Sequence, residues 1–198
     1  MIGLQDGSRR SGKKSLQRAF HLHATVVGCR PRVWRRFCVR ESMWLSRLHD
    51  VLQVAFNWYD YQTHSFQFDE RRYGNPLRRE EMIIEDDRNV TLRDVDALGV
   101  RHFLYRYHFG EGWMVELTVE KEVPAGKGER LPVCLAGERA GPPEACGSTK
   151  AYHDMLQALA AEGTDERQEW RAWLGPEHDP DACDPVKINR EIRRLWRT

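Results

Sequence analysis

The sequence has no long uncharged apolar run, and this absence excludes a membrane-spanning helix, which needs about 18 to 20 such residues. Its start, MIGLQDGSRRSGKK, lacks the apolar core of a secretory signal peptide. Its five cysteines are an odd number without close pairs, so they form no disulfide framework and fit a reducing compartment. We therefore expect a cytoplasmic protein with no membrane partner.

The motifs of the commonest enzyme classes are also missing. There is no G-x-S-x-G element, no complete phosphate-binding P-loop, no G-x-G-x-x-G fingerprint and no H-E-x-x-H zinc motif. These absences remove the most frequent hydrolase and nucleotide-binding signatures. What remains is a chain of 198 residues that is long enough to bury a sizeable core without a metal or a disulfide.

Charge is balanced over the whole chain but not along it. The 31 Lys and Arg residues nearly cancel the 30 Asp and Glu residues. Residues 1–50 contain eleven basic and three acidic residues, and the remainder contains 20 and 27, so the two parts carry +8 and −7. The last eleven residues are basic again, with four arginines and one glutamate. This asymmetry fits contact with nucleic acid, or a basic segment that docks on an acidic one within the fold.

The first half of the chain predicts strands around one helix. Residues 1–17 are polar and aperiodic, and we expect a flexible leader before a single domain over residues 18–198. Alternating apolar residues predict a hairpin of two strands over 20–26 and 33–39. Leucines at helical spacing predict a helix over 44–56, with Ser42 as its cap, before a short strand over 64–68.

The clearest local pattern is an alternation of aromatic and aliphatic residues on both sides of residues 110–112. A three-residue loop there pairs Tyr107 with Val115 and places Arg106 opposite Glu116. Both the apolar and the charged pairs are satisfied in this register, so we predict an antiparallel hairpin with it.

The remainder of the chain predicts a long connection and then helices. Residues 124–148 contain five Gly and four Pro without any period, which indicates a loop. Three helices follow, capped by Ser148 or Thr149, by Thr164 and by Asp184. Strands with one embedded helix, followed by a helical C-terminal third, predict an α+β fold whose sheet is mostly antiparallel.

Several stretches together resemble one known family. The stretches are PRVWRR (31–36), LHDVLQVAFNW (48–58) followed by His64 and Phe66, YRYHFGEGW (105–113), the Pro- and Gly-rich segment from Pro132 to Tyr152, Trp173-Leu174 and Asp179-Pro180. Their order and joint presence resemble the plasmid pRiA4b ORF-3-like proteins, the Ri-plasmid open-reading-frame-three family, over about residues 20–190. The resemblance implies a roll-like α+β fold and a setting on plasmids and beside transposases, and it implies no assigned reaction.

The chain departs from the pattern that it resembles. The family has Asp where this chain has His108 and Glu111, and typically His where it has Val115. The PPED element reads PPEA, so its Asp is replaced by Ala145. If these Asp and His residues form a metal or acid–base group in relatives, this chain keeps only part of it, which favours a member that is not an enzyme.

One set of candidate residues could bind a divalent ion. A catalytic metal needs about three His or carboxylate ligands and an open coordination position. The candidates are His49, His64, His108 and Glu111, with Trp58 and Trp113 beside them. Their spacing defines no geometry, and hydrogen bonds to the backbone explain His49 and His64 equally well.

A second set could contact nucleic acid, because bases stack on aromatic rings and guanidinium groups follow phosphates. Its members, interleaved with Trp34 and Trp44, are Arg32, Arg35, Arg36, Arg40 and Arg47. Packing of Trp34 beneath the helix explains the same pattern and is the interpretation that we favour.

The sequence thus favours a non-enzymatic binding or accessory protein of mobile-element type, whose partner is a protein or a nucleic acid. We expect no metal and no other cofactor. The alternative is a small metal-dependent hydrolase or nuclease that uses the His/Glu cluster. The oligomeric state stays open.

Overall fold

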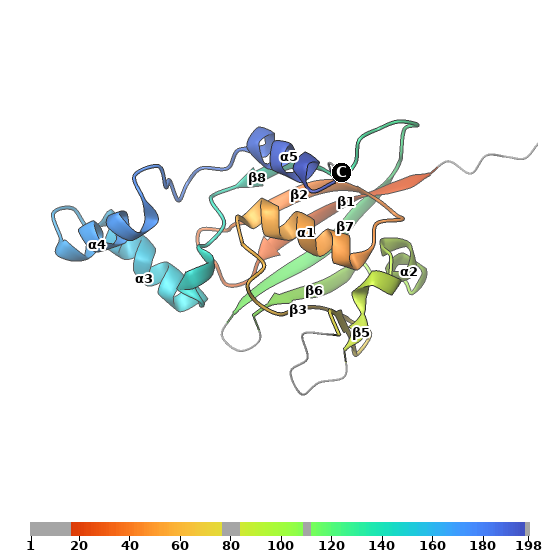
Figure 1. Cartoon of the computed structure of the whole chain (residues 1–198), viewed down its shortest axis with the longest axis horizontal. Helices are drawn as coiled ribbons and strands as arrows, with labels where there is room; N and C mark the ends of the chain where they lie inside the picture. Colours follow the sequence, from red (N-terminus) through yellow and green to blue (C-terminus); the bar gives the residue numbers. More distant parts are fainter. Residues whose placement is uncertain (1–16, 77–83, 109–111, 197–198) are drawn as a thin grey trace, which may run out of the picture.

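The structure is a computed structural model that describes residues 17–76, 84–108 and 112–196. Within these residues, one eight-stranded sheet has the strand order β5-β4-β3-β6-β7-β1-β2-β8 (Figure 1). Every neighbouring pair is antiparallel except β4 and β5, which are parallel. The sheet is therefore mixed but mostly antiparallel, as the hairpin patterns predict.

The described residues form these strands and helices in chain order. The strands are β1 (Arg18–Val26), β2 (Trp34–Arg40), β3 (His64–Phe68), β4 (Arg71–Gly74), β5 (Glu85–Asp86), β6 (His102–Tyr107), β7 (Trp113–Pro124) and β8 (Val133–Glu138). The α-helices are α1 (Leu45–Phe56), α2 (Leu92–Ala97), α3 (Thr149–Ala160), α4 (Asp165–Leu174) and α5 (Pro185–Arg194). Two 3₁₀ turns, η1 (Asp87–Asn89) and η2 (Glu144–Cys146), complete the set.

The predicted fold class, an α+β roll with one embedded helix and a helical C-terminal third, is wrong. A second helix, α2, also lies between strands, and the last third of the chain begins with strand β8 rather than with a loop. β8 pairs with β2 at the sheet edge, and Cys134 is its one buried residue. An edge strand with so little burial shows no alternation of apolar and polar residues. The glycines and prolines of this segment therefore led to the prediction of a loop instead of a strand.

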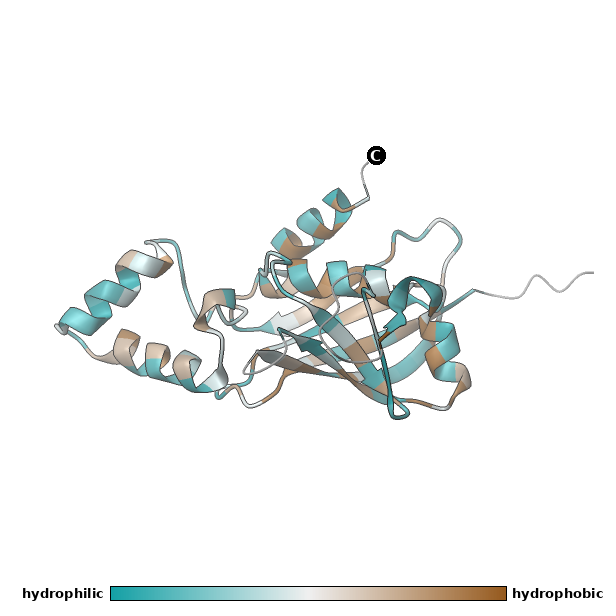
Figure 2. Cartoon of the chain, turned by 60° about the horizontal axis from the view of Figure 1, so that its bottom comes forward, coloured by the Kyte–Doolittle hydropathy of each residue, from teal (hydrophilic) through white to brown (hydrophobic). Residues whose placement is uncertain are grey.

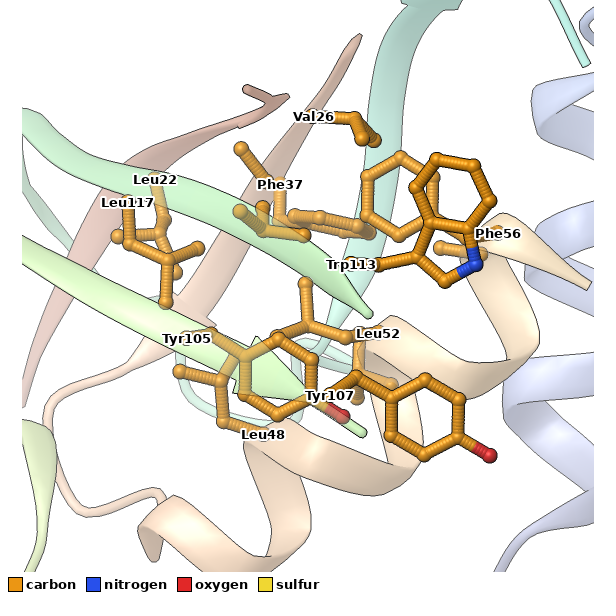
Figure 3. Close-up of a cluster of buried hydrophobic side chains, with 14 of the residues drawn as sticks. Leu22, Val26, Phe37, Leu48, Leu52, Phe56, Tyr105, Tyr107, Trp113 and Leu117 are labelled. Atoms are coloured by element: carbon orange, nitrogen blue, oxygen red, sulfur yellow. The ribbon is translucent and has the colours of Figure 1, made fainter. Parts of the chain in front are cut away.

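Helix α1 covers one face of the sheet and forms the core with it. Figure 3 shows its side chains Leu48, Leu52 and Phe56 close to Phe37, Tyr105 and Leu117 of the strands. The helix begins after Trp44, without a side-chain cap from Ser42, and it ends at Asn57 in the left-handed conformation. Asn tolerates this conformation better than most residues, so the chain turns sharply there toward the site described below.

The β6–β7 hairpin is present, but its predicted register is wrong by two residues. Tyr107 pairs with Trp113, and Tyr105 pairs with Val115. A shift of two keeps every side chain on its original face, so the alternation of apolar residues does not distinguish the two registers. The turn starts at His108, which has a positive φ of 65°. Glu111 lies outside the described residues.

The three predicted C-terminal helices are confirmed, with caps at Ser148, Thr164 and Asp184. Helices α3 and α4 lie against each other beyond one end of the sheet, whereas α5 packs on β8 and α1 (Figures 1 and 2). In the part of the chain that the structure describes, no helix has the length and apolar character that crossing a bilayer requires.

Candidate functional site

The structure brings His49 and His64 into direct contact. His49 lies in α1 and His64 is the first residue of β3, and both are almost fully buried. Their imidazole rings stack face to face, with centroids 3.6 Å apart and planes 10° apart. Two histidines that are fifteen positions apart in sequence thus form one buried pair.

His64 forms a buried pair with Asp87 of η1. The His64 Nε2 atom lies 2.7 Å from Asp87 Oδ2, and both side chains are buried. With Nε2 donating to this carboxylate, Nδ1 is the ring nitrogen that carries the lone pair. That Nδ1 atom is buried without a hydrogen-bond partner. Burial lowers the pKa of His64, and this effect outweighs the hydrogen bond with Asp87, which acts in the opposite direction.

His49 belongs to a second hydrogen-bonded chain. Its Nδ1 atom lies 2.8 Å from Tyr105 Oη, and its Nε2 atom lies 3.1 Å from Asp60 Oδ1. Gln53 donates to the same Tyr105 hydroxyl at 2.8 Å and accepts from the Asp60 backbone N–H at 2.9 Å. Burial raises the pKa of Tyr105, so its hydroxyl stays protonated and joins α1 to β6.

These residues could hold a metal ion only after a rearrangement. One ligand atom each from His49, Asp60 and His64 lies within 4.8 Å of the others. An imidazole lone pair lies in the plane of its ring, however, so rings stacked at 3.6 Å direct their lone pairs along parallel planes. One ring must turn before both bind a single ion. His108, the third predicted ligand, is exposed and lies outside this group.

A cavity of about 630 Å³ lies between the loop after α1, the ends of β6 and β7, the η2 segment and the end of α4. Its aromatic lining residues are Tyr59, Tyr61, Tyr107, Trp113 and Trp173. Tyr61 is 78% exposed, and its ring stacks on that of Tyr59 with centroids 5.8 Å apart. Among the described residues that line this cavity, none is Lys or Arg.

The Pro-Pro-Glu segment forms one wall of the cavity and is held firmly. The Tyr107 hydroxyl donates to Glu144 Oε1 at 2.5 Å, and the Tyr59 backbone N–H donates to Oε2 at 2.7 Å. Trp58 Nε1 donates to the carbonyl of Pro142 at 2.9 Å, and its ring stacks on Tyr107. Trp58 was predicted from the sequence, whereas Glu144 was not, although it stands in the PPE motif.

Arg35, a candidate for nucleic acid, is buried within the protein. It is 2% exposed, and its guanidinium donates to the backbone carbonyls of Ala55, Trp34 and Glu138. It therefore joins β2 to α1 and β8. A group in this position is not available to a ligand on the surface.

The other candidate arginines do not form one free surface. Arg36 binds both carboxylate oxygens of Glu120 at 2.7 Å. Three more lie elsewhere: Arg40 against the Gln17 side chain and the Glu129 carbonyl, Arg47 beside Asp50, and Arg32 exposed after β1. Most of these guanidinium groups already have an acceptor in the chain, which weakens the interpretation of this stretch as a nucleic-acid surface.

Comparison with known proteins gives a family but no reaction. The family described as "Plasmid pRiA4b ORF-3-like protein" matches residues 18–187. The "Uncharacterized protein y4hQ" of Sinorhizobium fredii is 32% identical over 178 residues, which are 88% of this chain and 90% of that protein. The crystal structure of the protein of unknown function MM3350 from Methanosarcina mazei Go1 has a TM-score of 0.78 and 30% identity, over 86% of this chain and 97% of that one.

Proposed function

This chain belongs to the plasmid pRiA4b ORF-3-like family, and from that premise we propose that it is a non-enzymatic binding or accessory module that holds a segment of a protein partner in the aromatic cavity. The observation that carries the proposal is the exposure of Tyr59, Tyr61 and Trp173 around one concave opening. Exposed aromatic groups gathered in this way mark interaction sites. Tyr and Trp also dominate the residues that contribute most to binding energy.

The charge of the cavity defines the chemistry of the partner. Glu144 lines it, Asp60 lies between Tyr59 and Tyr61 in the sequence, and the described lining residues include no Lys or Arg. Carboxylates and aromatic faces both attract an ammonium or guanidinium group. The partner segment therefore carries an aromatic or aliphatic side chain beside a Lys or Arg, and nucleic-acid phosphates are disfavoured here.

The test is selection of a displayed random-peptide library on the immobilised chain, followed by calorimetry with a selected peptide. We expect basic, aromatic peptides, and we expect Trp173→Ala to weaken binding by about 2 kcal/mol, roughly thirty-fold. Trp44→Ala is the matched control, because Trp44 is 45% exposed but does not line the cavity. Peptides that bind wild type, Trp173→Ala and Tyr61→Ala equally would contradict the proposal.

One observation favours the alternative, a small metal-dependent hydrolase or nuclease: the grouping of His49, Asp60 and His64. The stacked rings oppose it, because they must separate before both bind an ion. Titration with zinc and with manganese, followed by metal analysis, decides between the two functions. One ion per chain that is lost in His64→Ala but kept in His102→Ala, an exposed histidine of β6, would favour the hydrolase.

A further inference from the structure

We propose that single-stranded nucleic acid binds in a second groove, which α5 forms with the segment before β8. This groove has a volume of about 580 Å³, and Arg130, Arg190, Arg193, Arg194 and Trp196 line it. It shares no residue with the aromatic cavity. The two surfaces therefore serve different ligands, and the groove extends the proposed binding function without depending on it.

The rotation of α5 is set by its contacts with the domain. Asn189 accepts a hydrogen bond from the Cys134 backbone N–H at 2.7 Å and donates to the Cys134 carbonyl at 2.8 Å. This side chain thus occupies the open edge of β8 as a further strand would. Ile188 and Ile192, one helical turn apart, are buried on the same side. With that face turned inward, the arginines between and after these residues lie beside the groove.

The groove concentrates positive charge that the protein does not neutralise. Glu191 pairs with Arg190 at 3.3 Å and with Arg194 at 2.7 Å. Among the described residues, Arg130 and Arg193 have no ion-pair partner, and no carboxylate lines the groove. Two unpaired arginines, beside two that share one carboxylate, give the groove a net positive charge, and such charge in a concave surface raises the local concentration of a polyanion.

Tertiary structure brings a further cation to this end of the molecule. Arg40, at the end of β2, donates to the carbonyl of Glu129, the residue before Arg130. Arg40 also donates to the Gln17 side chain at 2.8 Å; both of its acceptors are uncharged, so its own charge is not neutralised by them. Arg40 and Arg130, which are far apart in sequence, thus lie at the same end of the sheet. Neither the charge count nor the Trp/Arg pattern at residues 32–47 predicts this location.

Trp196 favours single-stranded nucleic acid over a duplex or an acidic peptide as the ligand. Its half-buried ring lines the same groove as the four arginines. In proteins that bind single strands, guanidinium groups follow the phosphates and bases stack on aromatic rings. A duplex keeps its bases stacked on one another, and an acidic peptide has no base, so neither uses this ring.

The experiment is fluorescence anisotropy of the full chain with a labelled oligothymidylate of about 20 nucleotides, from about 50 to 200 mM salt. Each of Arg130→Gln and Arg193→Gln should weaken binding several-fold and reduce the slope of log K against log salt by about 0.7. Trp196→Ala should weaken binding about five-fold or more, and Trp196→Phe should restore it. Thermal unfolding of each variant confirms that it folds.

Arg47→Gln is the matched control, because Arg47 is 53% exposed and lies outside the groove. Trp173→Ala, which tests the aromatic cavity, should also leave nucleic-acid binding unchanged, so failure of one proposal is separable from failure of the other. Equal affinity for a duplex of the same length would overturn the proposal. Equal losses in Arg47→Gln and Arg193→Gln would overturn it as well.

Discussion

Four buried polar side chains distinguish the candidate site from the apolar core that surrounds it. His49, Gln53, His64 and Asp87 are each less than 9% exposed, in the region where α1 crosses β3 and β6. The Tyr105 hydroxyl connects two of them, with partners at 2.8 Å on both sides. Buried polar groups are costly unless they are hydrogen-bonded, so this hydroxyl is the link on which the network depends.

Tyr105→Phe should therefore destabilise the protein by about 1–3 kcal/mol, because it leaves His49 Nδ1 and Gln53 Nε2 buried without this partner. Chemical denaturation measures the change. Tyr107→Phe is the control, since it removes the same atom at a wall of the open cavity, where water can reach the Glu144 carboxylate. Equal losses for the two variants would show that the network adds nothing.

Ion pairs join several elements of the fold, and Glu41 takes part in two of them. Its carboxylate binds Arg18 of β1 at 2.8 Å and Arg93 of α2 at 3.1 Å, and it directly follows β2. Burial alone would raise the pKa of Glu41, but the hydrogen bonds from Arg93 and Arg18 outweigh it and hold the pKa below its ordinary value of 4.5. Three elements thus depend on one ionised group.

Glu41→Gln should lower stability at neutral pH by about 1 kcal/mol, and the difference from wild type should shrink as the pH falls below about 4.5. The sign follows from the lowered pKa. Below pH 4.5 the unfolded chain binds the proton before the folded chain does, so acid removes this contribution from the wild type only. Urea unfolding of both proteins from pH 7 to acid measures it. A constant difference across this range would contradict the assignment.

At the scale of the whole molecule, stability is unevenly distributed. Helix α1 lies in the core, whereas α4 has no buried residue and packs mainly on α3, beyond the end of the sheet (Figure 1). The residues at the end of α4 nevertheless line the aromatic cavity, through Trp173 and Leu174. One wall of the cavity is therefore formed by the sheet and the loop after α1, and another by α4, which has few packing contacts.

Amide hydrogen exchange followed by mass spectrometry should show this difference. We expect α4 to exchange on the order of a hundredfold faster than α1, because it opens without unfolding the sheet. A peptide bound in the cavity should slow exchange at the end of α4 and leave its start less affected. Uniform protection of α1 and α4 in the free protein would contradict this view.

Much of the candidate site follows from the resemblance, and the rest required spatial contact. The motif that includes His49, Gln53, Trp58 and His64 was visible in the sequence. His49, Gln53 and His64 converge, whereas Trp58 packs on Tyr107. Asp87 was not visible, because it lies on a short turn 23 residues after His64 and carries no motif of its own. Glu144 stood in the PPE motif, but its contacts with Tyr59 and Tyr107 are long-range and had no signal in the sequence.

The sequence by itself determined the family, the core helix over residues 45–56, the faces of the strands and the three capped helices near the end, because each depends on a local period or cap. Tertiary structure alone decided the register of the β6–β7 hairpin, the pairing of β8 with β2, the contact between the two histidines and the place where the free arginines gather. The physical reason is shared by all four. Each depends on how segments pair in space, and a local pattern is unchanged by a two-residue slip of a hairpin, by an edge partner or by a neighbour that is far away in sequence.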